Sequence, residues 1–147
     1  MGKIKIGVFG AGRGKTMIKH ILGSSEAELV AVCDKYEPLL EECKKRAEEA
    51  GLEGLTCYTD FEKFFAHDMD AVVLANYANE HAPYAIRLLD SGRHVMSECL
   101  TCATMKEAVE LIEANRVAID CMVDALLKKN HLKENEINEI FTANVKK

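Results

Sequence analysis

The chain has 147 residues, of which 48% are hydrophobic and 29% are charged, a composition typical of a globular domain with a real core. A formal net charge of −5 and the lack of a dense basic cluster argue against nucleic acid as a partner. Because no apolar run could cross a bilayer and no secretory signal opens the sequence, we expect a cytoplasmic protein without membrane contact.

The first 34 residues predict a strand, a glycine-rich turn, a helix and a second strand that ends at an acid. Lys3–Phe9 is expected to form a buried strand, and Gly10–Lys15 the turn that follows it. Helical spacing begins at Thr16, and the apolar run Leu29–Cys33 leads to Asp34. This is the order that a dinucleotide-binding βαβ unit requires.

The glycine turn suits a diphosphate. Gly10, Gly12 and Gly14 allow a tight turn and a close approach of phosphate, and the helix that follows offers free N–H groups. We expect Arg13 or Lys15 to add a positive charge. The usual Gly-x-Gly-x-x-Gly spacing would place the third glycine at Lys15, so we expect looser packing of helix on strand. A glycine-rich turn without any ligand is the alternative interpretation.

Asp34 is the candidate ribose-binding residue. It lies 22 residues after Gly12, close to the spacing of about 20 in this class of site. A carboxylate there accepts hydrogen bonds from ribose hydroxyls and repels a 2′-phosphate, which favours NAD over NADP. The neighbouring Lys35 would soften this preference, so NADP stays possible.

Strands and helices continue to alternate up to residue 97. We expect helices at 37–50, 59–65 (capped by Thr59) and 80–90, and strands at 55–58, 70–75 and 93–97. This alternation predicts an α/β fold, a doubly wound parallel sheet with strand order 3-2-1-4-5. The ligand crevice of such a sheet lies where the strand order reverses, and both Gly10–Gly14 and Asn76–His81 fall at that edge.

The sequence changes character after Gly92, because no further glycine or proline occurs. Thr104 with Glu107 predicts the cap of one long helix that reaches Leu126, and a second amphipathic segment follows a break at 128–130. We therefore expect a dinucleotide-binding domain at 1–114 and a helical extension at 115–147. The extension is expected to pack on the sheet or on a second copy of the chain, as a homo-oligomer.

Residues 3 to about 113 resemble the cofactor domain of the glucose–fructose oxidoreductase / inositol dehydrogenase (Gfo/Idh/MocA) family. Four stretches carry the resemblance: Ile6–Gly14, Ala31–Asp34, Asp70–Ala75 and His81–Glu98. Members are NAD(P)-dependent oxidoreductases that transfer hydride between nicotinamide and an alcohol of a sugar or cyclitol. The resemblance implies a diphosphate at Gly10–Gly14, ribose at Asp34, and further cofactor contacts at Asn76, His81 and, near the nicotinamide, Glu98.

Two departures from that family limit the expected activity. The family usually carries a lysine after the glutamate that follows the fifth strand, and Cys99 stands there after Glu98. The family's second, substrate-binding domain has no counterpart in these 147 residues. We therefore expect a truncated dehydrogenase that binds NAD but turns over little, with catalytic residues unknown. The alternative is a non-catalytic nucleotide-sensing or assembly module.

The six cysteines are expected to be free thiols, as in a reducing compartment. Cys99 and Cys102 form a Cys-x-x-Cys motif, which is either an incidental pair or a redox-active one. No second pair supplies the remaining ligands of a zinc site, so no metal is expected.

Overall fold

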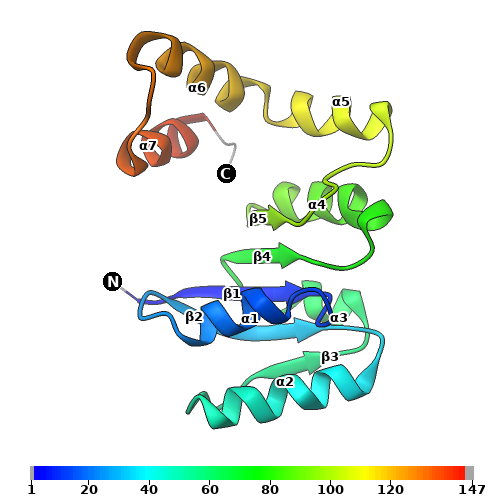
Figure 1. Cartoon of the computed structure of the whole chain (residues 1–147). Coiled ribbons are helices and arrows are strands. Elements are labelled where there is room, and N and C mark those ends of the chain that lie inside the picture. The colour runs from blue at the N-terminus through cyan, green and yellow to red at the C-terminus, as the bar shows by residue number, and fades with distance from the viewer. Residues whose placement is uncertain (1, 145–147) are drawn as a thin grey trace. The chain divides into compact units, whose positions relative to one another are not determined.

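A computed structural model describes residues 2–144 and contains a five-stranded sheet (Figure 1). All neighbouring strands are parallel, and their order is β3-β2-β1-β4-β5, which confirms the predicted topology. The strands are β1 (Ile4–Phe9), β2 (Ala27–Cys33), β3 (Thr56–Tyr58), β4 (Ala71–Leu74) and β5 (His94–Ser97).

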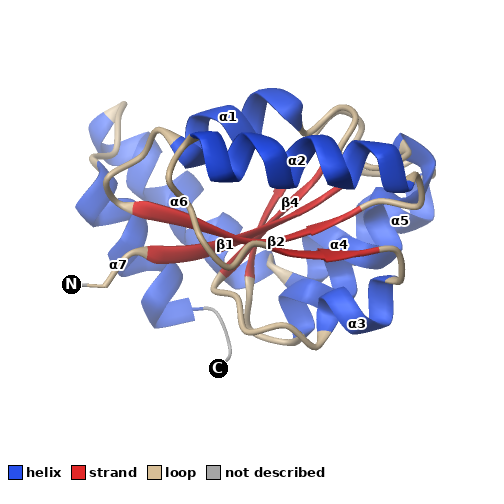
Figure 2. Cartoon of the chain, turned by 90° about the horizontal axis from the view of Figure 1, so that it is seen from below, coloured by secondary structure: helices blue, strands red, loops and turns tan. Residues whose placement is uncertain are grey.

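Helices cover both faces of this sheet (Figure 2). On one face lie α1 (Lys15–Leu22) and α2 (Glu37–Glu49), and on the other α3 (Phe61–Phe65) and α4 (His81–Asp90), which follows the short 3₁₀ helix η1 (Ala78–Glu80). The predicted cap of α3 is wrong by one residue. The side chain of Asp60, rather than Thr59, accepts a hydrogen bond from the Lys63 N–H at 3.0 Å.

The core of the sheet has a different composition on each face. Under α1 and α2 the core is mainly aliphatic and includes Ile18, Leu29 and Leu40. The opposite face holds a cluster of aromatic rings, in which Phe9 lies 5.0 Å from Phe61 and 4.9 Å from Tyr84 between ring centroids. These two layers bury residues 7–9 of β1 on both faces, so that the carboxyl end of the strand is held in a fixed position.

The chain divides into two compact units, Met1–Ala103 and Thr104–Lys147. The second unit contains α5 (Met105–Ala114), α6 (Arg116–Lys129) and α7 (Glu134–Asn144). Thr104 and Glu107 form the predicted capping box. The single long helix predicted beyond it is wrong, because the backbone leaves helical geometry at Asn115, between α5 and α6.

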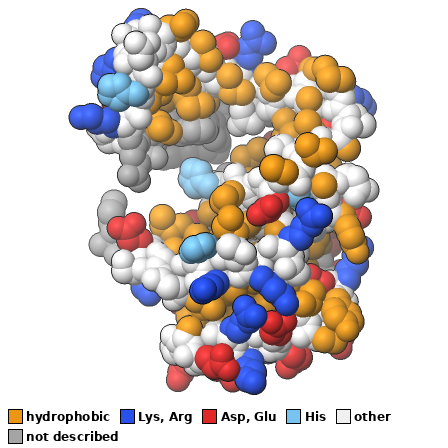
Figure 3. All heavy atoms as spheres, in the orientation of Figure 1, with side chains coloured by type: hydrophobic (Ala, Val, Ile, Leu, Met, Phe, Trp, Pro, Cys, Tyr) orange, Lys and Arg blue, Asp and Glu red, His pale blue; other side chains and the backbone are white. Residues whose placement is uncertain are grey.

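The helical unit exposes many apolar side chains, which Figure 3 shows in its upper part. Those exposed on α5 and α6 are Met105, Val109, Ile112, Val117, Val123, Leu126 and Leu127. In residues 2–144 no helix is both long enough and apolar enough to span a membrane. The domain boundary expected at 114/115 stays a prediction.

Candidate functional site

The carboxyl ends of β1, β2 and β4 meet at the glycine turn. The Gly10 N–H donates to the Cys33 carbonyl at 2.8 Å, and the Ala75 N–H donates to the Phe9 carbonyl at 2.7 Å. Gly10 has φ +100°, and a Cβ there would lie 2.4 Å from backbone atoms of Ala75 and Asn76. Only glycine fits here, because both the positive φ and the contact with the segment directly after β4 exclude a side chain.

Gly14 is also required by packing. A Cβ at this position would lie 2.5 Å from the Gly10 carbonyl oxygen and 2.7 Å from Cγ1 of Val8. The expectation of looser packing is therefore wrong, because Gly14 itself lets the start of α1 approach β1. The early glycine takes the role that the third glycine of the usual motif has in helix–strand packing.

Gly12 differs from the two other glycines of the turn. The nearest atom to a Cβ built at Gly12 is Cδ1 of Leu39 at 3.5 Å, an ordinary contact distance. Nothing in the described chain therefore requires glycine at this position. A glycine that the protein does not need is expected where a ligand approaches the backbone.

Asp34 stabilises the glycine turn and also lies at the site. Its Oδ2 accepts a hydrogen bond from the Ala11 N–H at 2.8 Å, and its Oδ1 accepts one from the Tyr36 N–H at 2.9 Å. Each carboxylate oxygen retains a further lone pair for a ribose hydroxyl. No sequence motif indicates these two hydrogen bonds, because the partners of Asp34 are backbone N–H groups.

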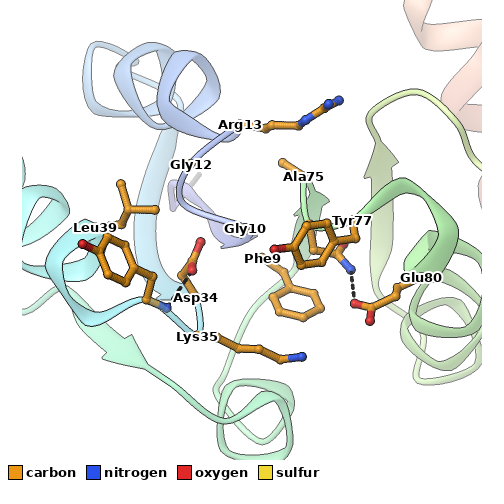
Figure 4. Close-up of a pocket in the computed structure, with 12 residues that line it drawn as sticks. Phe9, Gly10, Gly12, Arg13, Asp34, Lys35, Leu39, Ala75, Tyr77 and Glu80 are labelled. Carbon is orange, nitrogen blue, oxygen red and sulfur yellow. Dashed lines mark hydrogen bonds between the residues drawn. The ribbon is translucent and has the colours of Figure 1, made fainter.

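A cavity of about 610 Å³ opens at this edge of the sheet (Figure 4). Asp34 and Leu39 lie on one side of it, and Tyr77 and Glu80 on the other. Its lining consists of Phe9, Gly10, Gly12, Arg13, Asp34, Lys35, Tyr36, Leu39, Ala75, Asn76, Tyr77 and Glu80. A concave, largely apolar space with a few polar groups is typical of a site for a small molecule.

Two cations at the cavity are available for an anionic ligand. Neither Arg13 nor Lys35 makes a hydrogen bond or ion pair with another described residue. Lys15, the other cation predicted for the phosphate, instead pairs with Glu42, at 2.9 Å between Nζ and Oε2. This pairing holds the pKa of Glu42 below its usual range. Arg13 is thus the cation of the turn that has no acidic partner among the described residues.

Asn76 presents an unused acceptor. Its amide nitrogen donates to Oε2 of Glu80 at 3.4 Å, whereas its Oδ1 is buried and has no hydrogen-bond partner in the described structure. A buried acceptor without a donor is costly unless a ligand or water supplies one. Together with the open Gly12 and the unpaired Arg13, this atom fits the groups that a dinucleotide would bring.

His81 joins two loops from inside the protein. It is only 1% exposed, and its Nδ1 lies 2.9 Å from the Leu100 carbonyl and 3.1 Å from that of Glu98. Its Nε2 lies 3.2 Å from the Asn76 carbonyl oxygen. The ring therefore ties the segment after β4 to the segment after β5. Direct contact of His81 with the cofactor stays a prediction.

The segment after β5 does not contribute to the cavity lining. The Glu98 N–H donates to the Leu74 carbonyl at 2.9 Å, and Cys99 is exposed beyond it.

Burial raises the pKa of Cys33 to about 12 and that of Cys57 to about 11, so both thiols are inert at neutral pH. Within residues 2–144, no group of three or more His, Cys, Asp or Glu side chains is arranged to hold a metal ion.

The fold and the site define a Rossmann-type nucleotide-binding domain. Residues 4–123 match the sequence model of the GFO_IDH_MocA family, described as an oxidoreductase family with an NAD-binding Rossmann fold. The chain belongs to this family, as the resemblance predicted.

Relatives of known structure agree with this assignment. Scyllo-inositol dehydrogenase from Lactobacillus casei, solved with NAD(H) and scyllo-inositol, has a TM-score of 0.68 at 28% identity over 78% of this chain and 33% of that protein. The WlbA dehydrogenase from Bordetella pertussis, solved with NADH and UDP-GlcNAcA, has a TM-score of 0.62 at 30% identity over 76% and 33% of the two chains.

Among curated proteins, a glycosyl hydrolase family 109 protein from Shewanella pealeana is 26% identical over 96% of this chain and 34% of its own length. The chain thus spans about a third of the length of the relatives that it matches.

Proposed function

We propose that the chain binds NAD across the carboxyl ends of β1, β2 and β4. The backbone at Gly10, Gly12 and Gly14, with the Arg13 guanidinium, would hold the diphosphate. The observation that carries this proposal is Gly12, a glycine at the cavity wall where a Cβ would meet no protein atom closer than 3.5 Å. Asn76, which also lines the cavity, would use its unpaired Oδ1 to accept a hydrogen bond from the ligand.

Asp34 would select NAD over NADP. Its two oxygens are fixed by the Ala11 and Tyr36 amides and lie at the cavity wall, where they can accept ribose hydroxyls. A 2′-phosphate at the same position would meet a carboxylate that cannot turn away without losing these bonds. Lys35 also lines the cavity, so discrimination against NADP would be partial.

The activity of the whole family member would be hydride transfer between a nicotinamide and an alcohol of a sugar or cyclitol. The relatives solved with scyllo-inositol and UDP-GlcNAcA support this substrate class. Bound NAD would supply the hydride acceptor, and Glu98 and His81 would lie at that end of the cofactor. We expect little or no turnover by the 147 residues alone, since Cys99 occupies the usual lysine position and substrate positioning is a large part of catalysis.

Calorimetric titration with NAD⁺ and NADP⁺ tests this proposal on the 147-residue chain. We expect binding of NAD⁺ with higher affinity than NADP⁺. Gly12→Ala should leave the melting temperature unchanged, because the new methyl group meets no protein atom at less than 3.5 Å. It should raise the dissociation constant for NAD⁺ at least about tenfold, because the methyl group would occupy the place of the bound diphosphate. Gly23→Ala is the matched control, because Gly23 lies outside the cavity lining and a Cβ there would meet no atom closer than 3.6 Å. Absence of heat with both nucleotides would refute the proposal.

A second candidate function is an assembly module that binds nucleotide without catalysis. The exposed apolar side chains of α5 and α6 favour it, because such patches often mark a protein interface. A homo-oligomer would bury them between copies. Light scattering after size exclusion should then show a dimer that Leu127→Glu dissociates, while a monomer at all concentrations would exclude this role.

A further inference from the structure

We infer that His81 is a positioning residue of the nucleotide site, and that its imidazole carries a proton on each nitrogen and thereby holds two segments at once. Nε2 holds the segment after β4, which contains Asn76, and Nδ1 holds the segment after β5, which contains Glu98 and Leu100. This inference rests on the proposed function. It assigns to His81 a role that needs no contact between its side chain and the ligand.

The imidazole of His81 extends from a rigid element into the interior. His81 is 1% exposed, and it is the only buried residue with a polar or charged side chain in the part of the chain that the structure describes. It begins α4, a helix fixed on the sheet by the buried side chains of Ala82, Ala85 and Leu88. The two segments that the ring contacts have neither helical nor strand structure, so the ring can serve as their anchor.

Carbonyl oxygens face both nitrogens of the ring. Nε2 lies 3.2 Å from the Asn76 carbonyl oxygen, and Nδ1 lies 2.9 Å from that of Leu100 and 3.1 Å from that of Glu98. A carbonyl oxygen only accepts hydrogen bonds, so a ring nitrogen without a proton would direct its lone pair at another lone pair. A neutral imidazole has a single N–H and could therefore hold only one of the two segments.

The Ser97 hydroxyl does not remove this conflict. Its oxygen lies 3.0 Å from Nδ1 and could donate to that nitrogen if it had no proton. The Leu100 carbonyl oxygen would still face the lone pair of Nδ1 at 2.9 Å. With a proton on Nδ1, the Ser97 hydroxyl is free to donate to the Glu98 carbonyl at 3.1 Å, and each of these contacts joins a donor to an acceptor.

Dipoles rather than a carboxylate stabilise the charge of the ring. The groups that hydrogen-bond the imidazole are the three carbonyl oxygens and the Ser97 hydroxyl. Glu98 contributes its carbonyl oxygen, while the carboxylate of Glu80 accepts from the Asn76 amide. Arg87, on the same helix as His81, donates to a carboxylate of α3. Hydrogen bonds from a charged donor are the stronger ones, which favours the two-proton form here.

Asn76 connects the ring to the cavity. Its side chain lines the cavity with a buried, unpartnered Oδ1, and its carbonyl oxygen faces Nε2 of His81. Without the Nε2 contact, the peptide group of Asn76 could turn and carry this side chain out of place. The segment after β5 contributes no residue to the cavity lining, so the Nδ1 contacts should matter less for nucleotide binding.

Two amide variants separate the roles of the two nitrogens. His81→Gln keeps a donor near the position of Nε2, and His81→Asn keeps one near the position of Nδ1. In calorimetry, the dissociation constant for NAD⁺ should stay within about threefold of the parent chain in His81→Gln and rise at least about tenfold in His81→Asn. Melting temperatures should fall in both variants, because each loses the contacts of one nitrogen.

Equal affinities of these two variants for NAD⁺ would overturn the positioning role, whether both match the parent chain or both are weakened alike. The proposed function would stand in either case, because the parent chain would still bind NAD⁺. If the parent chain does not bind NAD⁺, the proposed function and this inference both fail.

The proton count is tested by the pH dependence of binding to the unmodified chain. When the ring loses one proton, the other should stay on Nδ1, where two carbonyl oxygens lie closer than the one at Nε2, so the contact with Asn76 is lost. The dissociation constant for NAD⁺ should therefore rise at least about threefold between about pH 6 and about pH 9. In His81→Gln, whose amide does not titrate, it should stay nearly constant. A constant value in the parent chain, or the same rise in both chains, would overturn the two-proton assignment.

Discussion

The sheet unit and the helical unit differ sharply in how they use their apolar residues. Of the described hydrophobic side chains that are buried, all except Ala118 belong to residues before 104. The helical unit has amphipathic helices and a capping box at the start of α5, yet most of its described large apolar residues are exposed. A cap and apolar periodicity therefore specify a helix, whereas a ligand site with fixed geometry needs packed layers such as those of the sheet unit.

Truncation of a large apolar side chain to alanine should therefore have very different costs in the two units. Phe64→Ala removes a fully buried ring that packs against Phe9 and Phe61, and we expect it to lower the free energy of unfolding by about 3–5 kcal/mol. Leu127→Ala removes a side chain that is 77% exposed and should change it by less than about 0.5 kcal/mol.

Urea denaturation followed by circular dichroism measures both values. Similar losses from Phe64→Ala and Leu127→Ala would mean that Leu127 is covered in solution, and the contrast between the units would fail. A dependence of the Leu127→Ala effect on protein concentration would identify a second copy of the chain as the cover.

A second prediction distinguishes the roles of Gly10, Gly12 and Gly14 in the glycine turn. Gly10→Ala forces a methyl group against the backbone at Ala75 and needs a left-handed φ, so we expect a loss of about 3 kcal/mol or more. Gly14→Ala should cost a similar amount because its contact is with the Gly10 carbonyl. Thermal melting checks the order: wild type and Gly12→Ala together, with the two other variants well below. A stable Gly10→Ala variant would contradict the close approach of the turn to β4.

The contrast within the turn shows how far the sequence could predict the site. Strand order, the glycine turn and Asp34 followed from periodicity and spacing, since parallel strands and short crossovers leave few topologies. The separate roles of Gly10, Gly12 and Gly14 could not be predicted, because they depend on which atoms of β4 and β1 lie within 3 Å.

Other features of the structure could not be predicted from the sequence, chiefly because they are contacts between residues that lie far apart along the chain. The pairing of Lys15, one of the two cations predicted for the phosphate, with Glu42 is an example. The environment of His81 involves carbonyl groups at Asn76 and Leu100 that carry no signal in the sequence. The break at Asn115 was missed because apolar spacing continues across it, while the backbone turns.

A third prediction concerns Asp34, whose two roles can be separated. Asp34→Ala removes two hydrogen bonds to the backbone N–H groups of Ala11 and Tyr36, and we expect a loss of stability of about 2 kcal/mol. NAD⁺ should bind less tightly and the preference over NADP⁺ should disappear, because the carboxylate that repels a 2′-phosphate is gone.

Asp34→Asn serves as the comparison. It keeps one acceptor oxygen for the turn but loses the charge, so stability should fall less while the nucleotide preference still falls. Calorimetry with both nucleotides gives the ratio of affinities. An unchanged ratio in Asp34→Ala would remove Asp34 from the ribose site and leave it only as a brace.

The smallest expected effect lies in the sheet unit but away from the site, where Arg87 of α4 donates two hydrogen bonds of 2.8 Å to Glu62 of α3. These bonds hold the pKa of Glu62 below its usual range. The unfolded chain therefore binds a proton at higher pH than the folded chain, and the stabilisation is present at neutral pH and lost as the pH falls through the lowered pKa. Glu62→Gln should make the melting temperature fall less steeply between about pH 5 and pH 3.

Glu53→Gln is the control. Glu53 is exposed and makes no hydrogen bond or ion pair with any described residue, so this variant should keep the pH dependence of the parent chain. An equal change in both variants would show that the ion pair of Glu62 with Arg87 contributes nothing beyond the general effect of net charge.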